Sequence, residues 1–300
     1  MSLIILLYAL FASSFSLGKV LLQYTTPIFL VGSRMLAGGL ILLAYQYLSP
    51  NQNFYFKKKH IWFFVQIVLF GVYFNYILRF WALNSMTSTK TCFLYNLAPF
   101  MSYIYSYFFF KEKMTPGKFA GLLIGFLGLI PILLTTSTSE QLLGEVSFIS
   151  LPEFAVIVSV ALHSYSWVVM RKLVRDKNYS PTLVNGITMT AGGLLALITS
   201  SLTGNIFPVT NVARFSGLLA IVVFISNIIC FNLYGSLLRK YSATFLSFAG
   251  FLAPLFAALY GWALLGETIP WHFYASSALV FIGLFLFYRE EIKEEASIEA

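Results

Sequence analysis

The stretch PIFLVGSRMLAGGL at residues 27–40 recurs 154 positions later as PTLVNGITMTAGGL at residues 181–194. The two stretches are identical at Pro27/Pro181, Gly32/Gly186, Met35/Met189, Ala37/Ala191, Gly38/Gly192, Gly39/Gly193 and Leu40/Leu194. A second set of matches, shifted by 155, pairs Leu97-Ala98-Pro99 with Leu252-Ala253-Pro254, Glu112 with Glu267, and Phe126-Leu127-Gly128-Leu129 with Phe281-Ile282-Gly283-Leu284. Because self-similarity at a fixed period indicates one structural unit used more than once, we interpret the chain as two copies of one unit.

The composition places this chain in a lipid bilayer. Of its 300 residues 59% are hydrophobic and only 10% are charged, and the mean hydropathy is +0.81. Soluble domains carry about a quarter charged residues. Only helices and closed barrels satisfy every backbone polar group in lipid. The apolar runs here approach the roughly 20 residues of a spanning helix and lack the two-residue alternation of barrel strands. We therefore expect an all-α integral membrane protein.

Ten transmembrane helices are expected. Their approximate ranges are 3–22, 28–48, 61–82, 90–110, 118–135, 152–171, 181–203, 215–238, 243–265 and 271–288. Each copy then crosses the bilayer five times, and an odd number of crossings places the copies in opposite orientations. The sequence thus predicts two inverted five-helix repeats around a central cavity, which is typical of secondary transporters. The expected division is residues 1–135 for the first repeat, 136–151 for an outer linker, 152–288 for the second repeat and 289–300 for a cytoplasmic tail.

The basic residues predict that both termini face the cytoplasm, because Lys and Arg are retained in short cytoplasmic loops. With the amino terminus inside, fourteen of them fall in inner loops and the tail, and three, Lys19, Lys90 and Arg214, fall in outer loops or helix ends. The net charge of +8 follows from this topology. The basic residues are spread over five segments, so no nucleic-acid partner is expected. The first apolar run lacks a positive amino-terminal region, which favours a retained helix over a signal peptide.

Four features resemble the EamA-type drug/metabolite transporter pattern. They are Arg34 with Leu36, Ala37 and Leu40; the two Leu-Ala-Pro motifs; Glu112 and Glu267; and residues 167–172. The resemblance covers nearly the whole chain and both copies. It implies ten helices in two inverted halves around a central cavity, with helices five and ten more peripheral, in a bacterial cytoplasmic (inner) membrane. It also implies a structural or gating role for Arg34. The departures, Asn96 before the first Leu-Ala-Pro and no acidic residue in mid-span, lie in the cavity.

Prolines and glycines mark special positions in the predicted helices. Pro99 and Pro254 occupy equivalent places in helices four and nine, where each removes a backbone donor, and they are either hinges or static bends. Gly117, Gly121 and Gly125 recur every four residues, which indicates a close helix contact. That contact is either internal or the interface of a homodimer.

Polar residues inside the spans are the candidates for the substrate site, because burying them in lipid is costly unless they are paired or face a wet cavity. Asn75 and Arg79 are four residues apart and share a helix face, as do His163 and Trp167. Arg79 either holds a substrate carboxylate or extends to water at the outer helix end. Asn96 and Tyr103 are seven residues apart, as are Asn227 and Tyr234, so each pair is expected to project toward one cavity. The predicted substrate-binding set is Asn75, Arg79, Tyr95, Asn96, Tyr103, His163, Trp167, Asn185, Asn227, Asn232 and Tyr234, with Arg34, Pro99 and Pro254 as gating or hinge residues.

Reactive motifs of enzymes are absent from the sequence, which has no His-Glu-x-x-His, Gly-x-Ser-x-Gly or phosphate-binding glycine loop. Cys92 and Cys230 lie in predicted spans and suggest no metal site or disulfide framework. We expect no catalysis and no cofactor. Without a mid-span carboxylate, exchange or facilitated diffusion is easier to support than proton-driven transport. His163 is either a core residue or the one candidate proton carrier.

The many aromatic residues suit a flat heterocycle or a cation. The sequence as a whole is similar to the S-adenosylmethionine carriers of obligate intracellular bacteria, a resemblance that implies S-adenosylmethionine uptake in exchange for S-adenosylhomocysteine (antiport). The partners are then a small-molecule substrate and the lipid bilayer. Two alternatives stay open: an exporter of amino acids or drugs with the same architecture, and a membrane scaffold that transports nothing.

Overall fold

The computed structural model describes residues 2–48, 56–111, 115–128, 130, 145–146, 149–241, 243–269 and 271–299. Glu112 and most of the predicted linker 136–151 lie outside these residues. The secondary structure of the described residues is helical apart from a short antiparallel pair of strands, β1 (Glu145–Val146) and β2 (Ile149–Ser150). The first copy contains α1 (Ser2–Leu22), α2 (Pro27–Leu48), η1 (Lys58–His60), α3 (Ile61–Gln66), η2 (Ile67–Tyr73), α4 (Phe74–Ser85), α5 (Ser88–Leu94), η3 (Tyr95–Leu97), α6 (Ala98–Phe110) and α7 (Pro116–Leu127). The second copy contains α10 (Leu151–Arg171), η4 (Lys172–Asp176), α11 (Pro181–Leu202), α12 (Val212–Val222), η5 (Val223–Cys230), α13 (Phe231–Leu237), α14 (Ala243–Ala249), η6 (Gly250–Leu252), α15 (Ala253–Leu265) and α16 (Trp271–Glu299).

Seven helical segments are long and apolar enough to cross a membrane, judged by length and composition over the described residues. They are Ser2–Leu22, Pro27–Leu48, Lys58–Ser85, Leu151–Asp176, Pro181–Leu202, Val212–Leu237 and Ala243–Leu265. Pro116–Leu127 and Trp271–Phe287 are apolar but shorter, and the segment from α5 to α6 is not among the seven. A helical segment therefore overlaps each of the ten expected ranges, while the expected end at 135 lies outside the described residues and the count of ten crossings stays a prediction. Residues 289–299, expected as a tail, continue α16.

Polar caps and prolines fix where several helices begin. Thr115 accepts the N–H of Lys118 at the start of α7, and Pro116 takes the first helical position, where no donor is needed. At the start of α10, Ser150 and Glu153 form a capping box: Glu153 Oε2 accepts the Ser150 N–H at 2.7 Å and Ser150 Oγ accepts the Glu153 N–H at 3.4 Å. The starts of these two helices are thus set by local sequence.

The two copies break their helices at equivalent places. A one-turn 3-10 segment separates two α-segments in each copy, η3 in the first and η6 in the second, 155 residues apart. Pro99 and Pro254 lie in the first turn of the segment that follows, where a missing N–H costs least. The segments then end at Lys111 and Gly266, both with left-handed backbone, at φ 58° and 65°. The prolines therefore begin new helical segments, in place of the mid-helix position expected from the sequence.

Each copy also contains a π-helical segment, η2 in the first copy and η5 in the second. Such segments free a backbone carbonyl from the regular α-helical pattern. Asn75 Nδ2 donates to Gly71 O at 3.0 Å, and Asn232 Nδ2 donates to Ile228 O at 2.7 Å. Asn75 and Asn232 each lie two residues after the end of a π-helical segment, and each donates to a carbonyl within that segment.

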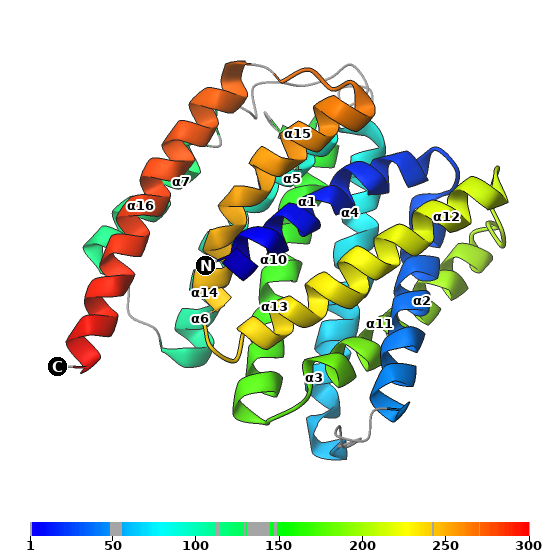
Figure 1. The fold of residues 1–300 in the computed structure, drawn as a ribbon, viewed down its shortest axis with the longest axis horizontal. Coiled ribbons are helices and arrows are strands. Elements are labelled where there is room, and N and C mark those ends of the chain that lie inside the picture. The colour runs from blue at the N-terminus through cyan, green and yellow to red at the C-terminus, as the bar shows by residue number, and fades with distance from the viewer. Residues whose placement is uncertain are drawn as a thin grey trace.

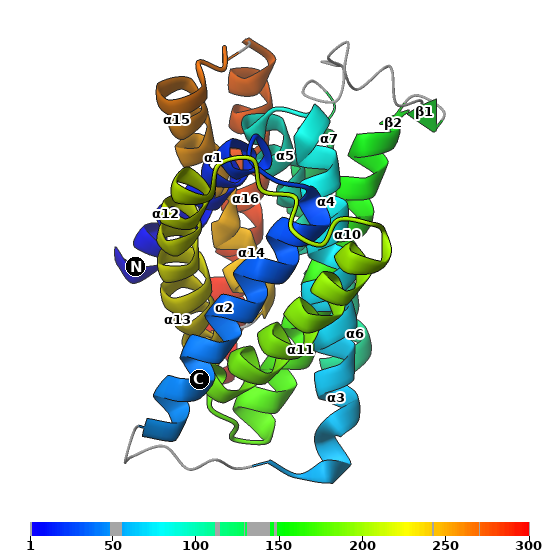
Figure 2. The same cartoon turned by 90° about the vertical axis from the view of Figure 1, so that its right-hand side faces the viewer.

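Helices α2 and α11 cross in close contact, and Figure 2 shows them side by side. A methyl group added at Gly39 would lie 3.0 Å from Gly186 O, and one added at Gly193 would lie 3.0 Å from Gly32 O. These contacts pair low numbers on one helix with high numbers on the other, so the helices run antiparallel. The absence of side chains at these positions lets the two backbones touch.

Helices α7 and α16 form a second close pair at one side of the molecule (Figure 1). A methyl group at Gly121 would lie 2.7 Å from Gly283 O, and one at Gly125 would lie 3.3 Å from the Phe100 ring. The glycine stripe therefore serves internal contacts, α7 against α16 and α6, and it is not available as a homodimer interface.

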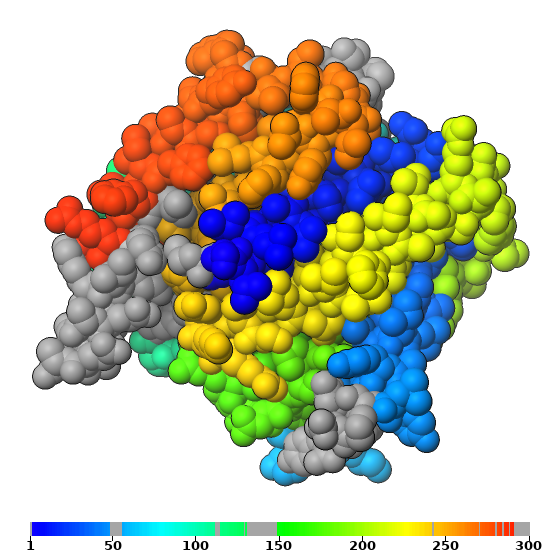
Figure 3. Space-filling model, viewed as in Figure 1, coloured from blue at the N-terminus to red at the C-terminus, as the bar shows by residue number. Residues whose placement is uncertain are grey.

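The remaining helices surround the centre. On the face shown in Figure 3, α1 lies between α15 and the segment from α12 to α13, in agreement with its contacts. In the second copy, α10 contacts α4, η2 and α6 of the first copy. Helix α1 thus packs mainly against the second copy and α10 mainly against the first, and between them lies the cavity described below.

A buried ion pair joins the starts of α5 and α10, since Lys90 Nζ lies 2.8 Å from Glu153 Oε1. Lys90, expected at an outer helix end, is buried with only 4% of its surface exposed. Beside it, Glu267 accepts hydrogen bonds from the N–H and hydroxyl groups of Ser88 and Thr89, at 2.8 to 3.2 Å. A carboxylate at a helix amino terminus is stabilised by the helix dipole. Glu267, a residue of the repeated pattern, therefore links the end of α15 to the start of α5.

Gly193→Ala tests the crossing of α2 and α11. The added methyl group would meet the backbone of Leu36, and overpacking of this kind costs about 1 to 3 kcal/mol. We expect a lower Tm and less monodisperse protein in detergent. Gly217→Ala on α12 is the matched control, because a methyl group there meets nothing within 4 Å and alanine favours helix. Equal Tm values for the two variants would contradict the close crossing.

Candidate functional site

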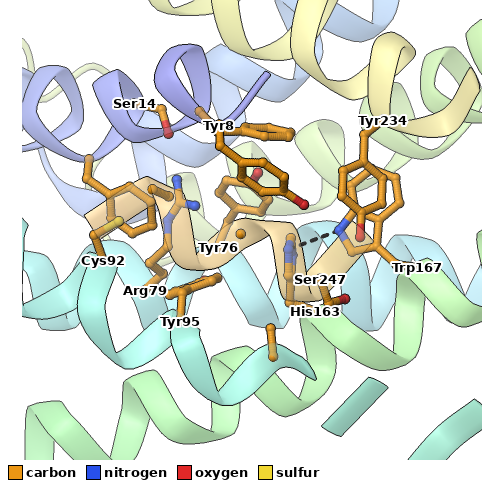
Figure 4. Close-up of a pocket in the computed structure, with 15 residues that line it drawn as sticks. Tyr8, Ser14, Tyr76, Arg79, Cys92, Tyr95, His163, Trp167, Tyr234 and Ser247 are labelled. Atoms are coloured by element: carbon orange, nitrogen blue, oxygen red, sulfur yellow. Dashed lines mark hydrogen bonds between the residues drawn. The ribbon is translucent and has the colours of Figure 1, made fainter. Parts of the chain in front are cut away.

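A cavity, here called the central cavity, lies between α1, α4, α5, α10, α13 and the segment from α14 to α15 (Figure 4). It holds about 620 Å³ of space free of protein atoms, open solvent included. Both copies of the repeat contribute to its lining. The lining residues are Tyr8, Phe11, Ser14, Phe15, Tyr76, Arg79, Cys92, Tyr95, Ala98, His163, Trp167, Tyr234, Ser247, Gly250 and Ala253.

Arg79 is the one charged side chain among these lining residues, and it is held by aromatic rings. Its guanidinium carbon lies 4.4 Å from the centre of the Tyr76 ring, 4.8 Å from that of Phe15 and 5.8 Å from that of Tyr95. The side chain is 4% exposed, so it does not extend to the surface of the protein. Cation–π contacts of this kind stabilise the positive charge of a guanidinium but do not neutralise it.

The Arg79 guanidinium keeps free hydrogen-bond donors. Its Nε and Nη2 atoms are buried and have no hydrogen-bond partner in the described part of the chain. No described carboxylate forms an ion pair with it either. A buried cation without a counter-charge is costly, and such a residue within a membrane segment indicates a functional site. The arrangement suits an anionic group of a ligand, such as a carboxylate, which accepts two parallel hydrogen bonds from arginine.

Arg34 has a different environment. It is fully buried on α2, where Nε donates to Asn227 Oδ1 at 2.7 Å and Nη2 donates to Ser226 Oγ at 2.6 Å. Both acceptors belong to η5. Arg34 does not line the central cavity. Through these two hydrogen bonds Arg34 links α2 of the first copy to η5 of the second.

Asn75 lies outside the central cavity and forms a hydrogen bond with one of its lining residues. Its Oδ1 accepts hydrogen bonds from Ser159 Oγ at 2.7 Å and from Tyr95 Oη at 3.1 Å. Ser159 Oγ also lies 2.8 Å from Tyr95 Oη. Since Asn75 is fully buried and does not line the cavity, it positions Tyr95 without facing the ligand space.

His163 and Trp167 form a hydrogen-bonded pair on α10 (Figure 4). Trp167 Nε1 donates to His163 Nε2 at 2.9 Å. The indole nitrogen can only donate, so His163 Nε2 accepts and carries no proton. The other ring nitrogen, Nδ1, lies 3.3 Å from Asn75 Nδ2. The Trp167 ring also lies 4.1 Å from the Tyr234 ring. In Figure 4 this group stands at one end of the view and Arg79 at the other.

The structure brings together five of the predicted site residues in the central cavity: Arg79, Tyr95, His163, Trp167 and Tyr234. Asn75 lies directly behind them. Asn185 lies in a smaller neighbouring cavity and donates to Asn232 Oδ1 at 3.2 Å, while Asn232 lines neither cavity.

Two pairs seven residues apart do not project together as expected. Asn227 is buried against Arg34 while Tyr234 lines the cavity, because the π-helical segment η5 has more residues per turn than an α-helix and rotates the later residues. Asn96, in η3, and Tyr103, in α6, are both buried and line neither cavity. Both amide atoms of Asn96 have no hydrogen-bond partner among the described residues.

Sequence reasoning missed the contribution of α1. Tyr8, Phe11 and Phe15 line the cavity from one face of this helix. Their spacing of three and four residues is the signal that could have found them, but aromatic residues at this spacing also occur in lipid-facing helices. Ser247 and Gly250 were missed as well, since small residues carry no signal of their own.

Comparison with known proteins agrees with this architecture. The sequence model of the EamA-like transporter family matches residues 1–134 and again residues 150–289. Proteins named S-adenosylmethionine/S-adenosylhomocysteine transporter from Chlamydia muridarum (strain MoPn / Nigg) and Chlamydia trachomatis serovar D are each 34% identical to this chain over 95% of its length, and the matches cover 90% and 88% of those proteins. A solved crystal structure at 18% identity has a TM-score of 0.69 and covers 95% of this chain and 94% of its own, which shows a common fold. The chain therefore belongs to the EamA-like transporter family and is a multi-pass membrane transporter.

Proposed function

We propose that the protein imports S-adenosylmethionine in exchange for S-adenosylhomocysteine, with the central cavity as the binding site. The observation that carries the proposal is Arg79, a buried guanidinium with free donors in an aromatic cavity between the two copies. Both ligands carry an α-carboxylate, which Arg79 would bind. The names of the Chlamydia relatives support this choice of substrate.

The aromatic lining supports the rest of the ligand. Adenine has a flat π-surface that stacks on aromatic rings, and the sulfonium of S-adenosylmethionine is a cation that aromatic faces attract. Trp167 and Tyr234 offer such faces at the end of the cavity away from Arg79, and Tyr8 offers another between them and Arg79 (Figure 4). The same Arg79 would bind the carboxylate of a free amino acid, so an amino-acid exporter is the second candidate.

We further infer that the copies are inverted repeats, residues 1–135 and 152–288, whose ten helices work by alternating access. The reciprocal crossing of α2 and α11 supports this, because Gly39 meets Gly186 and the equivalent Gly193 meets Gly32. The paired breaks at η3 and η6 support it too, and the helix starts at Pro99 and Pro254 are the proposed hinges. The distribution of basic residues supports a cytoplasmic-membrane location with both termini in the cytoplasm.

Reporter fusions test the inverted topology. A fusion after Phe110 should be cytoplasmic and active as green fluorescent protein, and one after Leu265 should be periplasmic and active as alkaline phosphatase. The reason is that the equivalent helix ends of two inverted copies face opposite sides. The fusion after Phe110 serves as the control for the one after Leu265. Both fusions on the same side would contradict the topology.

Exchange in proteoliposomes tests the transport activity. Liposomes containing the protein are loaded with labelled S-adenosylmethionine, and external S-adenosylhomocysteine should accelerate the loss of label. External methionine should not, because it lacks the nucleoside. Protein-free liposomes are the control. Acceleration by methionine would favour the amino-acid exporter, and no acceleration by S-adenosylhomocysteine would contradict exchange.

A further inference from the structure

A group of polar residues, here called the outer charged cluster, joins the two copies where α5 and α10 begin, which is the outer end in the proposed topology. It consists of Ser88, Thr89 and Lys90 of α5, Glu153 of α10 and Glu267 beyond α15. The ion pair of Lys90 with Glu153 and the four hydrogen bonds that Glu267 accepts all run between the first copy and the second. Two carboxylates of the second copy therefore hold the first turn of α5 in the first copy.

The cluster lies between the central cavity and the outer end of the molecule. Cys92, two residues after Lys90 on α5, lines the cavity at the same end as Arg79 (Figure 4). His163, which also lines the cavity, is ten residues after Glu153 on α10, or about 15 Å along a helix axis. Both helices thus run from the cluster into the cavity, and Figure 2 shows α5 and the end of α15 near the upper end of the molecule. An opening of the cavity between α5 and α10 at that end would separate the residues of the cluster.

Separating the cluster changes the surroundings of two buried charges at once. Lys90 and Glu153 are only 4% and 0% exposed. A buried charge that loses its partner is costly until water reaches it. The ion pair is therefore either closed and dry or open and hydrated, and a contact with two such discrete arrangements can act as a conformational switch.

The helical segments that carry the cluster end in breaks. Helix α5 is a short segment, followed by the 3-10 turn η3 and the proposed hinge at Pro99. In the other copy, α15 ends at Gly266 with left-handed backbone, directly before Glu267. These segments can therefore move apart without bending a regular helix.

We propose that the outer charged cluster is the outer gate of the central cavity. The gate is closed in this structure, and it opens when α5 moves away from α10 and from Glu267. Opening exposes Cys92 and Arg79 to the outer side, so that a ligand can enter with its carboxylate toward Arg79. This inference rests on the alternating access of the proposed function and names the residues that close one side of the cavity.

Cys92 reports on the gate, because it lines the cavity directly inside the cluster. The chain has two cysteines, so a Cys230→Ala background leaves Cys92 as its one thiol. The rate at which a membrane-impermeant maleimide labels Cys92 is measured in right-side-out vesicles, for access from the outer side, and in inside-out vesicles, for access from the inner side.

The double variant Lys90→Met with Glu153→Gln removes the ion pair without leaving either charge buried alone, and glutamine also suits a capping box. We expect labelling from the outer side to rise about two- to tenfold, the effect of one lost hydrogen bond. Labelling from the inner side should fall, because weakening one closed state shifts the population toward the other. Glu267→Gln weakens the hydrogen bonds to α5 and should change both rates in the same directions. It provides the test if the double variant does not fold.

Asp176→Asn is the matched control, because Asp176 is exposed and lies beyond the other end of α10. Its two labelling rates should equal those of the background protein. Faster labelling of the gate variants from both sides would indicate general loosening and would overturn the gate, as would an unchanged rate from the outer side. If the background protein still exchanges substrate, either result leaves the proposed function standing. Labelling from one side only, in the background protein and in every variant, would overturn alternating access as well.

Discussion

Helices α2 and α11 meet backbone to backbone because glycines occupy reciprocal positions on them. Gly32 packs against Leu197 as Gly186 packs against Leu43, and the same reciprocity extends to Gly38 against Asn227 and Gly192 against Val72. These contacts repeat when α2 and α11 are exchanged, so each of the two helices meets the other in the same way. Helices α1 and α10 and their neighbours from both copies enclose the cavity.

Equivalent positions of the two copies contribute different side chains to the lining of the cavity. Cys92 and Ser247 are 155 residues apart and both line it, as do Tyr95 and Gly250. Where one copy presents a tyrosine, the other presents a glycine against the Tyr8 ring. Two copies of one repeat thus enclose a site whose two sides differ, with the guanidinium of Arg79 contributed by the first copy alone. An asymmetric site suits a ligand whose two ends differ in charge.

The sequence predicts the helices well because hydropathy and repeated motifs are local signals. It also identifies Asn75 with Arg79 and His163 with Trp167, since α4 and α10 are regular where these pairs lie and four residues make about one turn. It fails for Asn227 with Tyr234, since one π-helical segment changes the phase. The ion pair of Lys90 with Glu153 and the contribution of Tyr8 could not be predicted, because both depend on which helices become neighbours in the folded protein.

Binding of the substrate carboxylate by Arg79 is the central claim, and a pair of ligands tests it directly. The Kd of S-adenosylhomocysteine and that of methylthioadenosine, which has no carboxylate, can be measured for the wild type, for Arg79→Gln and for the exposed control Arg214→Gln. We predict that Arg79→Gln weakens S-adenosylhomocysteine roughly tenfold to a hundredfold, the loss expected for a charged hydrogen bond. Methylthioadenosine should bind equally well to all three proteins. An unchanged affinity of Arg79→Gln for S-adenosylhomocysteine would contradict the account.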